Sequence, residues 1–256
     1  MRAAEGAPRP GPPGPFRRAP PARYYAGCVS QAPAPPARDA ADRPGLFLTF
    51  EGGDGVGKTT QTRILAEALR AEGVEVLVTR EPGGTDLGAE IRRLLLDGGH
   101  VDPRAEALLY AADRAHHVAT LVRPALERGA VVVSDRYLDS SVAYQGAARS
   151  LGAEDVRSLS LWATGGLLPD RTILLDADPA LADRRTGGRG GRDRLERESD
   201  AFRAALREQF LALADAEPER IVVIDAARPV EAVTAAVRSA LDPLLDARSG
   251  PGGRGA

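Results

Sequence analysis

The feature that most constrains the fold is a glycine-rich octapeptide at residues 52–59, Gly-Gly-Asp-Gly-Val-Gly-Lys-Thr. It matches the pattern Gly-x-x-x-x-Gly-Lys-Ser/Thr at every fixed position. Residues 46–51 before it form a short apolar run typical of a buried strand, and residues 58–71 after it place apolar side chains on one helix face. The sequence therefore predicts a phosphate-binding loop between a strand and a helix.

The residue types of this loop fit a nucleoside triphosphate. Glycines let the backbone turn its N–H groups inward, and the following helix directs its partially positive end to the same place. We expect Lys58 to pair with the β and γ phosphates and the Thr59 hydroxyl to ligate Mg²⁺. The predicted nucleotide-binding residues are Gly52, Gly53, Asp54, Gly55, Val56, Gly57, Lys58, Thr59 and Thr60.

Other nucleotide-binding classes are excluded by simple counts. A dinucleotide fingerprint would need glycine at the position of Lys58. Lys58 is also the only lysine among 34 basic residues, a bias typical of a GC-rich coding genome, and the chain has no asparagine. The Asn-Lys-x-Asp base-recognition motif of GTP-switch proteins therefore cannot occur.

Composition narrows the remaining classes. A net charge of −2 does not favour a general nucleic-acid coat. The longest apolar runs, near residues 131–133 and 173–175, are far shorter than the ~20 residues of a membrane helix. The single cysteine, Cys28, cannot form an intramolecular disulfide.

Five apolar segments alternate with helical patterns along the chain. We expect strands at 46–51, 74–79, 131–135, 172–176 and 221–225. We expect helices at 58–71, 87–96, 104–128, 140–150, 153–163, 179–185, 194–214 and 229–245. This alternation predicts an α/β fold with a five-stranded parallel sheet covered by helices on both faces, whose ligands bind beyond the carboxyl ends of the strands.

The long helix at 104–128 carries two further expectations. Its apolar stripe is predicted to consist of Leu108, Leu109, Ala112, Val118 and Leu121. The adjacent pair His116 and His117 has no partner pattern, so we expect both to lie on the helix surface.

The two ends of the chain differ from the part between them. Residues 1–44 hold 11 of the 20 prolines, with seven arginines and three acidic residues, and lack the apolar core of a secretory signal. We interpret them as a disordered extension, either a basic tether or the product of a start codon placed too far upstream. Residues 248–256 are glycine-rich and predict a flexible tail, which leaves 45–247 as the folded domain.

Three more motifs lie after strand ends or on the long helix. Thr-Arg-Glu-Pro-Gly-Gly-Thr occupies 79–85, Asp-Arg-Tyr occupies 135–137 with Ser-Ser-Val-Ala-Tyr-Gln-Gly at 140–146, and Tyr-Ala-Ala-Asp-Arg occupies 110–114. The planar fork of Arg136 suits a monophosphate, the alternative being a surface ion pair with Asp135. Arg80 is either a second phosphate contact or a solvent-exposed arginine at a strand end.

With these motifs at these spacings, the chain resembles the thymidylate kinases from about residue 46 to about residue 245. The resemblance implies a P-loop, nucleoside monophosphate kinase-like fold with a short lid, and transfer of phosphate from ATP to dTMP with Mg²⁺, giving dTDP for dTTP synthesis. It implies that Arg136 and Arg80 hold the acceptor phosphate and that Glu81 shapes their loop. Asp135 would lie near the metal and the phosphates.

The resemblance also implies contacts to the rest of the acceptor nucleotide. Tyr110 matches an aromatic residue that stacks on thymine, although its neighbours equally fit a helix core. Arg114 matches a donor to a thymine carbonyl, and Ser141 a residue that hydrogen-bonds the base. Tyr144 matches the aromatic residue that crowds the sugar 2′ position, and Gln145 a further nucleotide contact.

A glycine- and arginine-rich segment at 184–194 matches the lid of the family. In members that place the basic residues there, the phosphate loop has no arginine, and this chain has Gly55 at that position. We expect Arg189 and Arg192, with Arg185 as the alternative, to stabilise the transferred phosphoryl group, an effect worth about 10³–10⁵ in rate. Asp54 would lie near the acceptor sugar and the metal. The predicted catalytic residues are Lys58, Arg136, Asp54, Arg189 and Arg192.

For the whole protein, the resemblance implies a cytoplasmic homodimer that uses the long helix at its interface and has no nucleic-acid or membrane partner. Two alternatives stay open. One is a different nucleoside or deoxynucleoside monophosphate kinase on the same scaffold. The other is a non-kinase P-loop ATPase that acts as a binding or assembly module.

Overall fold

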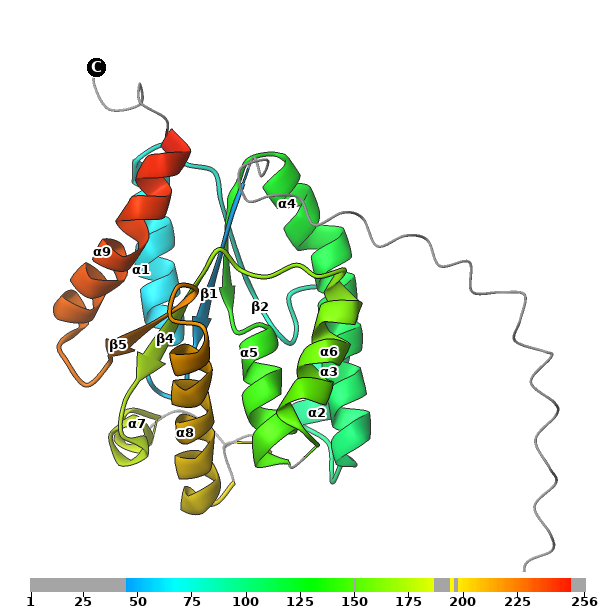
Figure 1. Ribbon diagram of the computed structural model, residues 1–256. Coiled ribbons are helices and arrows are strands. Elements are labelled where there is room, and N and C mark those ends of the chain that lie inside the picture. Colours follow the sequence, from blue (N-terminus) through cyan, green and yellow to red (C-terminus); the bar gives the residue numbers. More distant parts are fainter. Residues whose placement is uncertain (1–44, 150, 187–193, 196–197, 250–256) are drawn as a thin grey trace, which may run out of the picture. The chain divides into compact units, whose positions relative to one another are not determined.

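The computed structural model describes residues 45–149, 151–186, 194–195 and 198–249 (Figure 1). The predicted extension at 1–44 lies outside these residues, as do positions 250–256 of the predicted tail and most of the predicted lid.

Five parallel strands form one sheet in the order β2-β3-β1-β4-β5, which confirms the predicted fold class. The strands are β1 (Leu46–Glu51), β2 (Val76–Arg80), β3 (Val131–Asp135), β4 (Arg171–Asp176) and β5 (Ile221–Asp225). Alternation along β1 divides its side chains between two cores, with Leu48 and Phe50 in one and Phe47 in the other. Because all strands run the same way, the loops after their carboxyl ends meet at one edge of the sheet.

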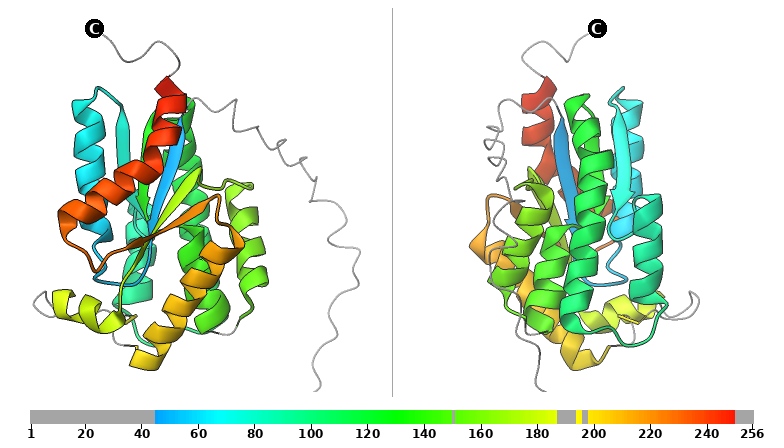
Figure 2. Two further views of the ribbon diagram at one scale, coloured as in Figure 1. Left: turned by 60° about the vertical axis from the view of Figure 1, so that its left-hand side comes forward. Right: turned by 90° about the vertical axis from the view of Figure 1, so that its right-hand side faces the viewer.

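Helices cover both faces of the sheet (Figure 2). The helices are α1 (Lys58–Ala71), α2 (Asp86–Leu96), α3 (Pro103–His117), α4 (Arg123–Glu127), α5 (Leu138–Ser141), α6 (Ala153–Thr164), α7 (Pro179–Thr186), α8 (Asp200–Ala216) and α9 (Val230–Ser249). Helices α1 and α9 bury Leu65, Leu69 and Val237 against one sheet face. Helix α4 and its neighbours pack on the other face, where α2 and α6 both contact α3.

The predicted helix at 104–128 is one continuous run of three parts. Helix α3 passes through a π-helical turn, η3 (Val118–Val122), into α4. Pro124 has no N–H to donate to the preceding turn, and the wider π turn lies directly before it.

The predicted apolar stripe of this helix is wrong at its amino-terminal end. Leu108 is 58% exposed, and Ala112 is also exposed. The buried face instead carries polar residues, among them Glu106, Asp113 and Arg114. Hydrophobic periodicity fails here because this part of the helix buries a hydrogen-bonded network.

Several other boundaries differ from the prediction. Strand β2 begins at Val76, because Val74 still belongs to the turn after α1 and donates its N–H to the Leu69 carbonyl. Helix α8 begins at Asp200, six residues later than predicted, because the Ser199 side chain caps it by accepting from the N–H of Phe202. The helix predicted at 140–150 begins at Leu138 and continues as a π helix, η4 (Val142–Ala148).

Candidate functional site

The phosphate loop closes tightly between β1 and α1. Gly52 has a φ of 127°, and a Cβ at this position would overlap the Leu175 carbonyl oxygen, so only glycine fits. The amine of Lys58 is buried and donates to the carbonyl oxygens of Gly52, at 3.1 Å, and Gly53, at 2.6 Å. Burial and the nearby guanidinium of Arg136 lower the pKa of Lys58, while Asp135 and Asp54 oppose them. The loop thus places a buried cation at its centre.

A cavity of about 490 Å³ lies over this loop at the carboxyl edge of the sheet. It collects most of the predicted site. The predicted residues that line it are Gly52, Gly53, Asp54, Gly55, Val56, Gly57, Lys58, Thr59, Thr60, Arg80, Glu81, Asp135, Arg136 and Tyr144. Loops after β1, β2 and β3 therefore contribute to one cavity, as the predicted sheet requires.

Arg136 connects the loop after β3 to the phosphate loop. Its backbone lies in the left-handed region, with a φ of 73° that is uncommon for a residue other than glycine. Its guanidinium donates to the Gly52 carbonyl and the Ser140 hydroxyl, both at 3.0 Å, and pairs with Asp54 at 2.5 Å. The ring of Tyr144 lies 5.3 Å from the guanidinium carbon. Its ion-pair partner is therefore Asp54 of the loop, rather than the adjacent Asp135 considered above.

Two residues that support Arg136, Glu51 and Ser140, were not predicted from the sequence. The buried Glu51 carboxyl accepts from the N–H of Tyr137 at 2.7 Å and the hydroxyl of Ser140 at 2.5 Å. Burial, with help from Asp139, raises the pKa of Glu51 to about 7, while Arg136 opposes this shift. The only signal in the sequence was a carboxylate at the end of a mainly apolar strand.

Two oxygen ligands suited to Mg²⁺ lie side by side at the loop. The Thr59 hydroxyl donates to Asp135 Oδ2 at 2.9 Å. In the described part of the chain, no group of three or more His, Cys, Asp or Glu residues could hold a metal. Hydroxyl and carboxylate oxygens nevertheless fit Mg²⁺, which commonly takes one or two protein ligands and fills its shell with water and phosphate.

Four predicted substrate residues lie beside the cavity rather than on its wall. They are Tyr110, Arg114, Ser141 and Gln145, all buried. Tyr110 packs with Ile91 and Leu95, and Gln145 donates its amide to Glu106 at 2.7 Å. Their contacts to the acceptor base remain predictions.

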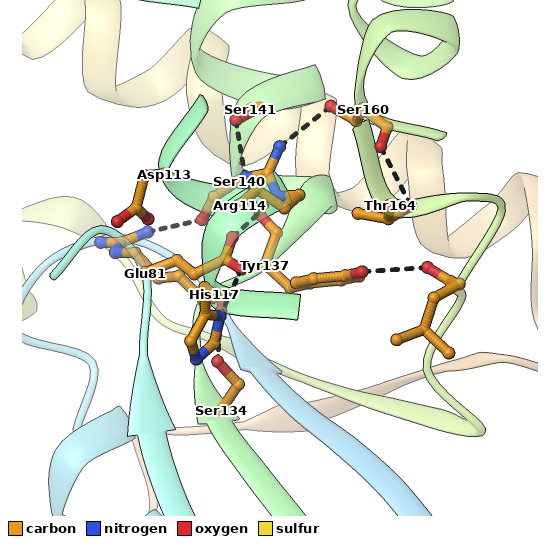
Figure 3. A network of polar contacts seen from close by, with 12 residues as sticks. Glu81, Asp113, Arg114, His117, Ser134, Tyr137, Ser140, Ser141, Ser160 and Thr164 are labelled. Atoms are coloured by element: carbon orange, nitrogen blue, oxygen red, sulfur yellow. Dashed lines mark hydrogen bonds and ion pairs between the residues drawn. The ribbon is translucent and has the colours of Figure 1, made fainter. Parts of the chain in front are cut away.

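Arg114 and Ser141 belong to a buried polar network (Figure 3). Arg114 donates to Glu81 at 2.7 Å, to Ser160 and Ser141 at 3.0 Å, and to the Tyr137 carbonyl at 3.2 Å. These bonds use four of the five N–H groups of a guanidinium. Glu81 raises the pKa of Arg114, although burial opposes it. The network joins the loop after β2 to helices α3, α5 and α6.

The expectation that His117 lies on the helix surface is wrong. Its side chain is fully buried in this network and contacts Glu81 and Thr79. Sequence could not reveal this, because Thr79 lies in β2 and Glu81 in the loop after it, both more than 30 residues away.

Other cationic residues complete the cavity wall. The pair Arg203 and Arg207 from α8 line it with Arg92 and Arg185, and of these only Arg185 was a candidate from the sequence. Arg207 forms a bidentate pair with Asp176 at the end of β4, at 2.6 and 2.7 Å. The four-residue spacing of the two α8 arginines was a readable signal. The predicted Arg189 and Arg192 lie outside the described residues.

The next residue that the structure describes is Arg194, which is held by residues of α2 and α3. Its Nε donates to the Leu95 carbonyl at 2.8 Å, and its guanidinium pairs with the buried Glu106. This anchor connects the carboxyl end of the predicted lid to α2 and α3.

Comparison with known proteins gives a consistent result. A family model described as thymidylate kinase matches residues 50–237. The thymidylate kinase of Leifsonia xyli is 64% identical over 203 residues, 78% of this chain and 96% of that protein. That of Clavibacter michiganensis is 61% identical over 205 residues, 79% of this chain and 97% of that protein. The crystal structure of thymidylate kinase from Ehrlichia chaffeensis superposes with a TM-score of 0.64 at 32% identity, covering 77% of this chain and 98% of that one.

In the described part of the chain, no helix is both long enough and apolar enough to cross a membrane.

Proposed function

Because this chain belongs to the thymidylate kinase family and phosphorylates dTMP to dTDP, we propose that donor and acceptor phosphates meet in the cavity over the phosphate loop. ATP is the proposed donor. One observation carries the proposal: Arg136 of the acceptor-side motif donates directly to Gly52 of the phosphate loop. A phosphate held by Arg136 would therefore lie beside phosphates held by the loop.

The proposed role of each residue follows from its place in the cavity. Lys58 and the loop N–H groups bind the donor phosphates, and Arg136 and Arg80 bind the acceptor phosphate from the opposite wall. An oxygen of the acceptor phosphate attacks the terminal phosphorus of ATP, and the bond to ADP breaks. That oxygen is already ionised at pH 7, so positioning and charge neutralisation supply the catalysis. Asp54 orients Arg136 through their ion pair.

Thr59 and Asp135 are the proposed Mg²⁺ ligands, supported by their 2.9 Å contact and their oxygen chemistry. When bound, the ion neutralises charge on the donor phosphates. The proposed roles of Arg189 and Arg192 rest on the sequence alone, because both lie outside the described residues.

Thymine recognition is proposed for Tyr110, Arg114, Ser141 and Gln145. Two observations support this. The four residues lie beside the cavity, and Arg114 donates to Glu81, which lines it. Tyr144 is the proposed barrier to ribonucleotides, since its ring borders the cavity and its hydroxyl lies 3.3 Å from Asp54.

We also propose a homodimer formed through α2, α3 and α6. Among the described residues, seven large apolar side chains are exposed, and four of them, Leu87, Leu94, Leu108 and Trp162, belong to these three neighbouring helices. Such clustering is typical of a protein interface. The folded domain at 45–247 is proposed as a cytoplasmic enzyme without nucleic-acid or membrane partners.

A coupled assay with ATP, Mg²⁺ and a panel of monophosphates at fixed ATP tests the proposal. We expect dTMP to give the highest kcat/KM and dTDP to form in step with ADP. Preference for dCMP or dAMP would instead favour another monophosphate kinase. ADP release without an acceptor would favour a non-kinase ATPase.

A further inference from the structure

Both ring nitrogens of His117 contact residues that flank Arg80 at the proposed acceptor-phosphate site. Nδ1 lies 2.7 Å from Glu81 Oε1, and Nε2 lies 2.7 Å from the Thr79 hydroxyl. A carboxylate only accepts hydrogen bonds, so Nδ1 carries a proton and donates to Glu81. The Thr79 hydroxyl can donate to the other nitrogen or accept from it, so both ring nitrogens are paired. The two contacts together fix the plane of the ring.

Glu81 divides its carboxylate between two residues of α3. Oε1 accepts from His117, and Oε2 accepts from Arg114 at 2.7 Å. Removing the histidine contact would leave the carboxylate held on one side only and free to rotate about its last bond. The direction of Glu81 therefore depends on His117.

Glu81 connects the two segments that carry Arg80 and Arg136, through its backbone and through its side chain. Glu81 directly follows Arg80, and its N–H donates to the Asp135 carbonyl at 3.0 Å. Through Arg114, it also reaches the carbonyl of Tyr137, the neighbour of Arg136. Figure 3 shows Glu81, Arg114 and His117 close together in this network.

The ring also limits the space available to the loop after β2. A Cβ on Gly84 would lie 2.8 Å from His117 Cδ2 and 2.6 Å from the Thr79 hydroxyl. The loop backbone therefore rests directly on the ring and its partner. Any change in the imidazole is transmitted to the segment that begins with Arg80.

We infer that His117 is a positioning residue for the acceptor phosphate. It holds Glu81 so that Arg80 and Arg136 keep one fixed separation across the cavity. Apolar residues of similar volume commonly stabilise a buried site at least as well as a buried ion pair does, so stability alone does not explain the cluster. The cluster supplies direction instead. This inference rests on the acceptor site proposed above.

The test compares His117→Ala with wild type in steady-state kinetics and in equilibrium binding of dTMP and ATP. We expect the KM and Kd for dTMP to rise tenfold or more and the Kd for ATP to stay within twofold. A dTMP affinity within twofold of wild type, or equal losses for both nucleotides, would overturn the inference. His116→Ala is the matched control, because His116 is half-buried on the same helix, and it should match wild type.

Two conservative variants separate positioning from filling of space. The asparagine amide can place an N–H near the position of Nδ1, whereas the glutamine amide reaches the position of Nε2. His117→Asn should therefore bind dTMP more tightly than His117→Gln, since only asparagine restores the donor to Glu81. Equal affinities or the reverse order would contradict the role, and this comparison decides the question if the alanine variant does not fold.

Arg136→Ala distinguishes failure of this inference from failure of the proposed site. If Arg136→Ala weakens dTMP binding and His117→Ala does not, the acceptor site stands and the role of His117 falls. If neither substitution weakens it, both fall.

Discussion

Asp54 and Arg136 lie 82 residues apart in the chain, and their side chains form an ion pair of 2.5 Å across the mouth of the phosphate loop. The Asp54 side chain is 41% exposed, whereas that of Arg136 is only 16% exposed. Arg136, followed by Lys58, keeps the pKa of Asp54 below its ordinary value although burial opposes them. This pair joins the donor-side loop to the acceptor-side loop.

Replacing Arg136 tests the acceptor-phosphate role. Arg136→Ala removes a guanidinium whose hydrogen bonds to a charged group contribute about 1.5–3 kcal/mol. We expect the Kd for dTMP to rise at least tenfold, measured by titration calorimetry, and the Kd for ATP to change much less. Arg63→Ala, at an exposed pair on α1, is the control. Equal weakening of both nucleotides would contradict the assignment.

Replacing Asp135 tests the metal site. Asp135→Asn keeps the size of the side chain and removes the charge beside the Thr59 hydroxyl. The Mg²⁺ concentration that gives half-maximal activity should rise by about tenfold or more, because Mg²⁺ prefers carboxylate ligands. The Kd for dTMP without Mg²⁺ should not move. An unchanged Mg²⁺ requirement would remove Asp135 from the site, and Asp155→Asn on α6 is the control.

The buried Asp113 predicts a pH-dependent stability. Burial first, and the charge of Glu81 second, raise its pKa from 3.8 to about 6, and its Oδ2 has no hydrogen-bond partner within the described structure. Because the folded-state pKa is raised, this carboxyl contributes fully below about pH 4, and its contribution is lost as the pH rises through 6. The shift corresponds to about 3 kcal/mol at most.

Asp113→Asn removes this titration and keeps the acceptor for the Gly83 N–H. The Tm of the variant minus that of wild type should increase by on the order of 5 °C between pH 4.5 and pH 8. Thermal unfolding followed by circular dichroism measures it, with Asp97→Asn at an exposed helix end as control. A difference that stays constant over this range would contradict the prediction.

The exposed face of α3 tests the proposed dimer. Leu108→Glu places a charge on a side chain that is 58% exposed. The mass in solution, measured by light scattering after gel filtration, should fall from that of a dimer to that of a monomer. Val230→Glu, at an apolar residue that is 46% exposed on α9, should leave the mass unchanged. A dimer that survives the Leu108 change would exclude this face.

Much of the fold was predictable because local signals agreed with it. Strands β1, β3 and β5 have the predicted ends, since each is a mainly apolar run that ends in Glu51, Asp135 or Asp225. The start of α8 was missed although Ser199 is a good cap, because an apparently helical pattern began earlier. The π turns were missed because hydrophobic periodicity does not distinguish a π turn from the α-helix around it, although Pro124 follows one of them directly.

The phosphate side of the site was predictable and the polar network was not. The phosphate loop is contiguous in sequence, so its chemistry can be read directly. The network of Glu81, Arg114 and His117 forms only when the segment after β2 packs on α3. Hydrophobic periodicity along the chain does not predict such a contact. Buried polar residues on a helix also look like a solvent-exposed face until the structure is known.

The inverted amphipathicity of α3 has a consequence for engineering the protein. Its 15 residues turn Glu106, Arg114 and His117 inward and Leu108 outward. On the proposals made above, solubility of a free subunit depends on one face of this helix, and placement of Arg80 and Arg136 depends on the other. Surface redesign for expression or crystallisation can be confined to the outer face, whereas a hydrophobicity-guided choice of positions would alter the catalytic side.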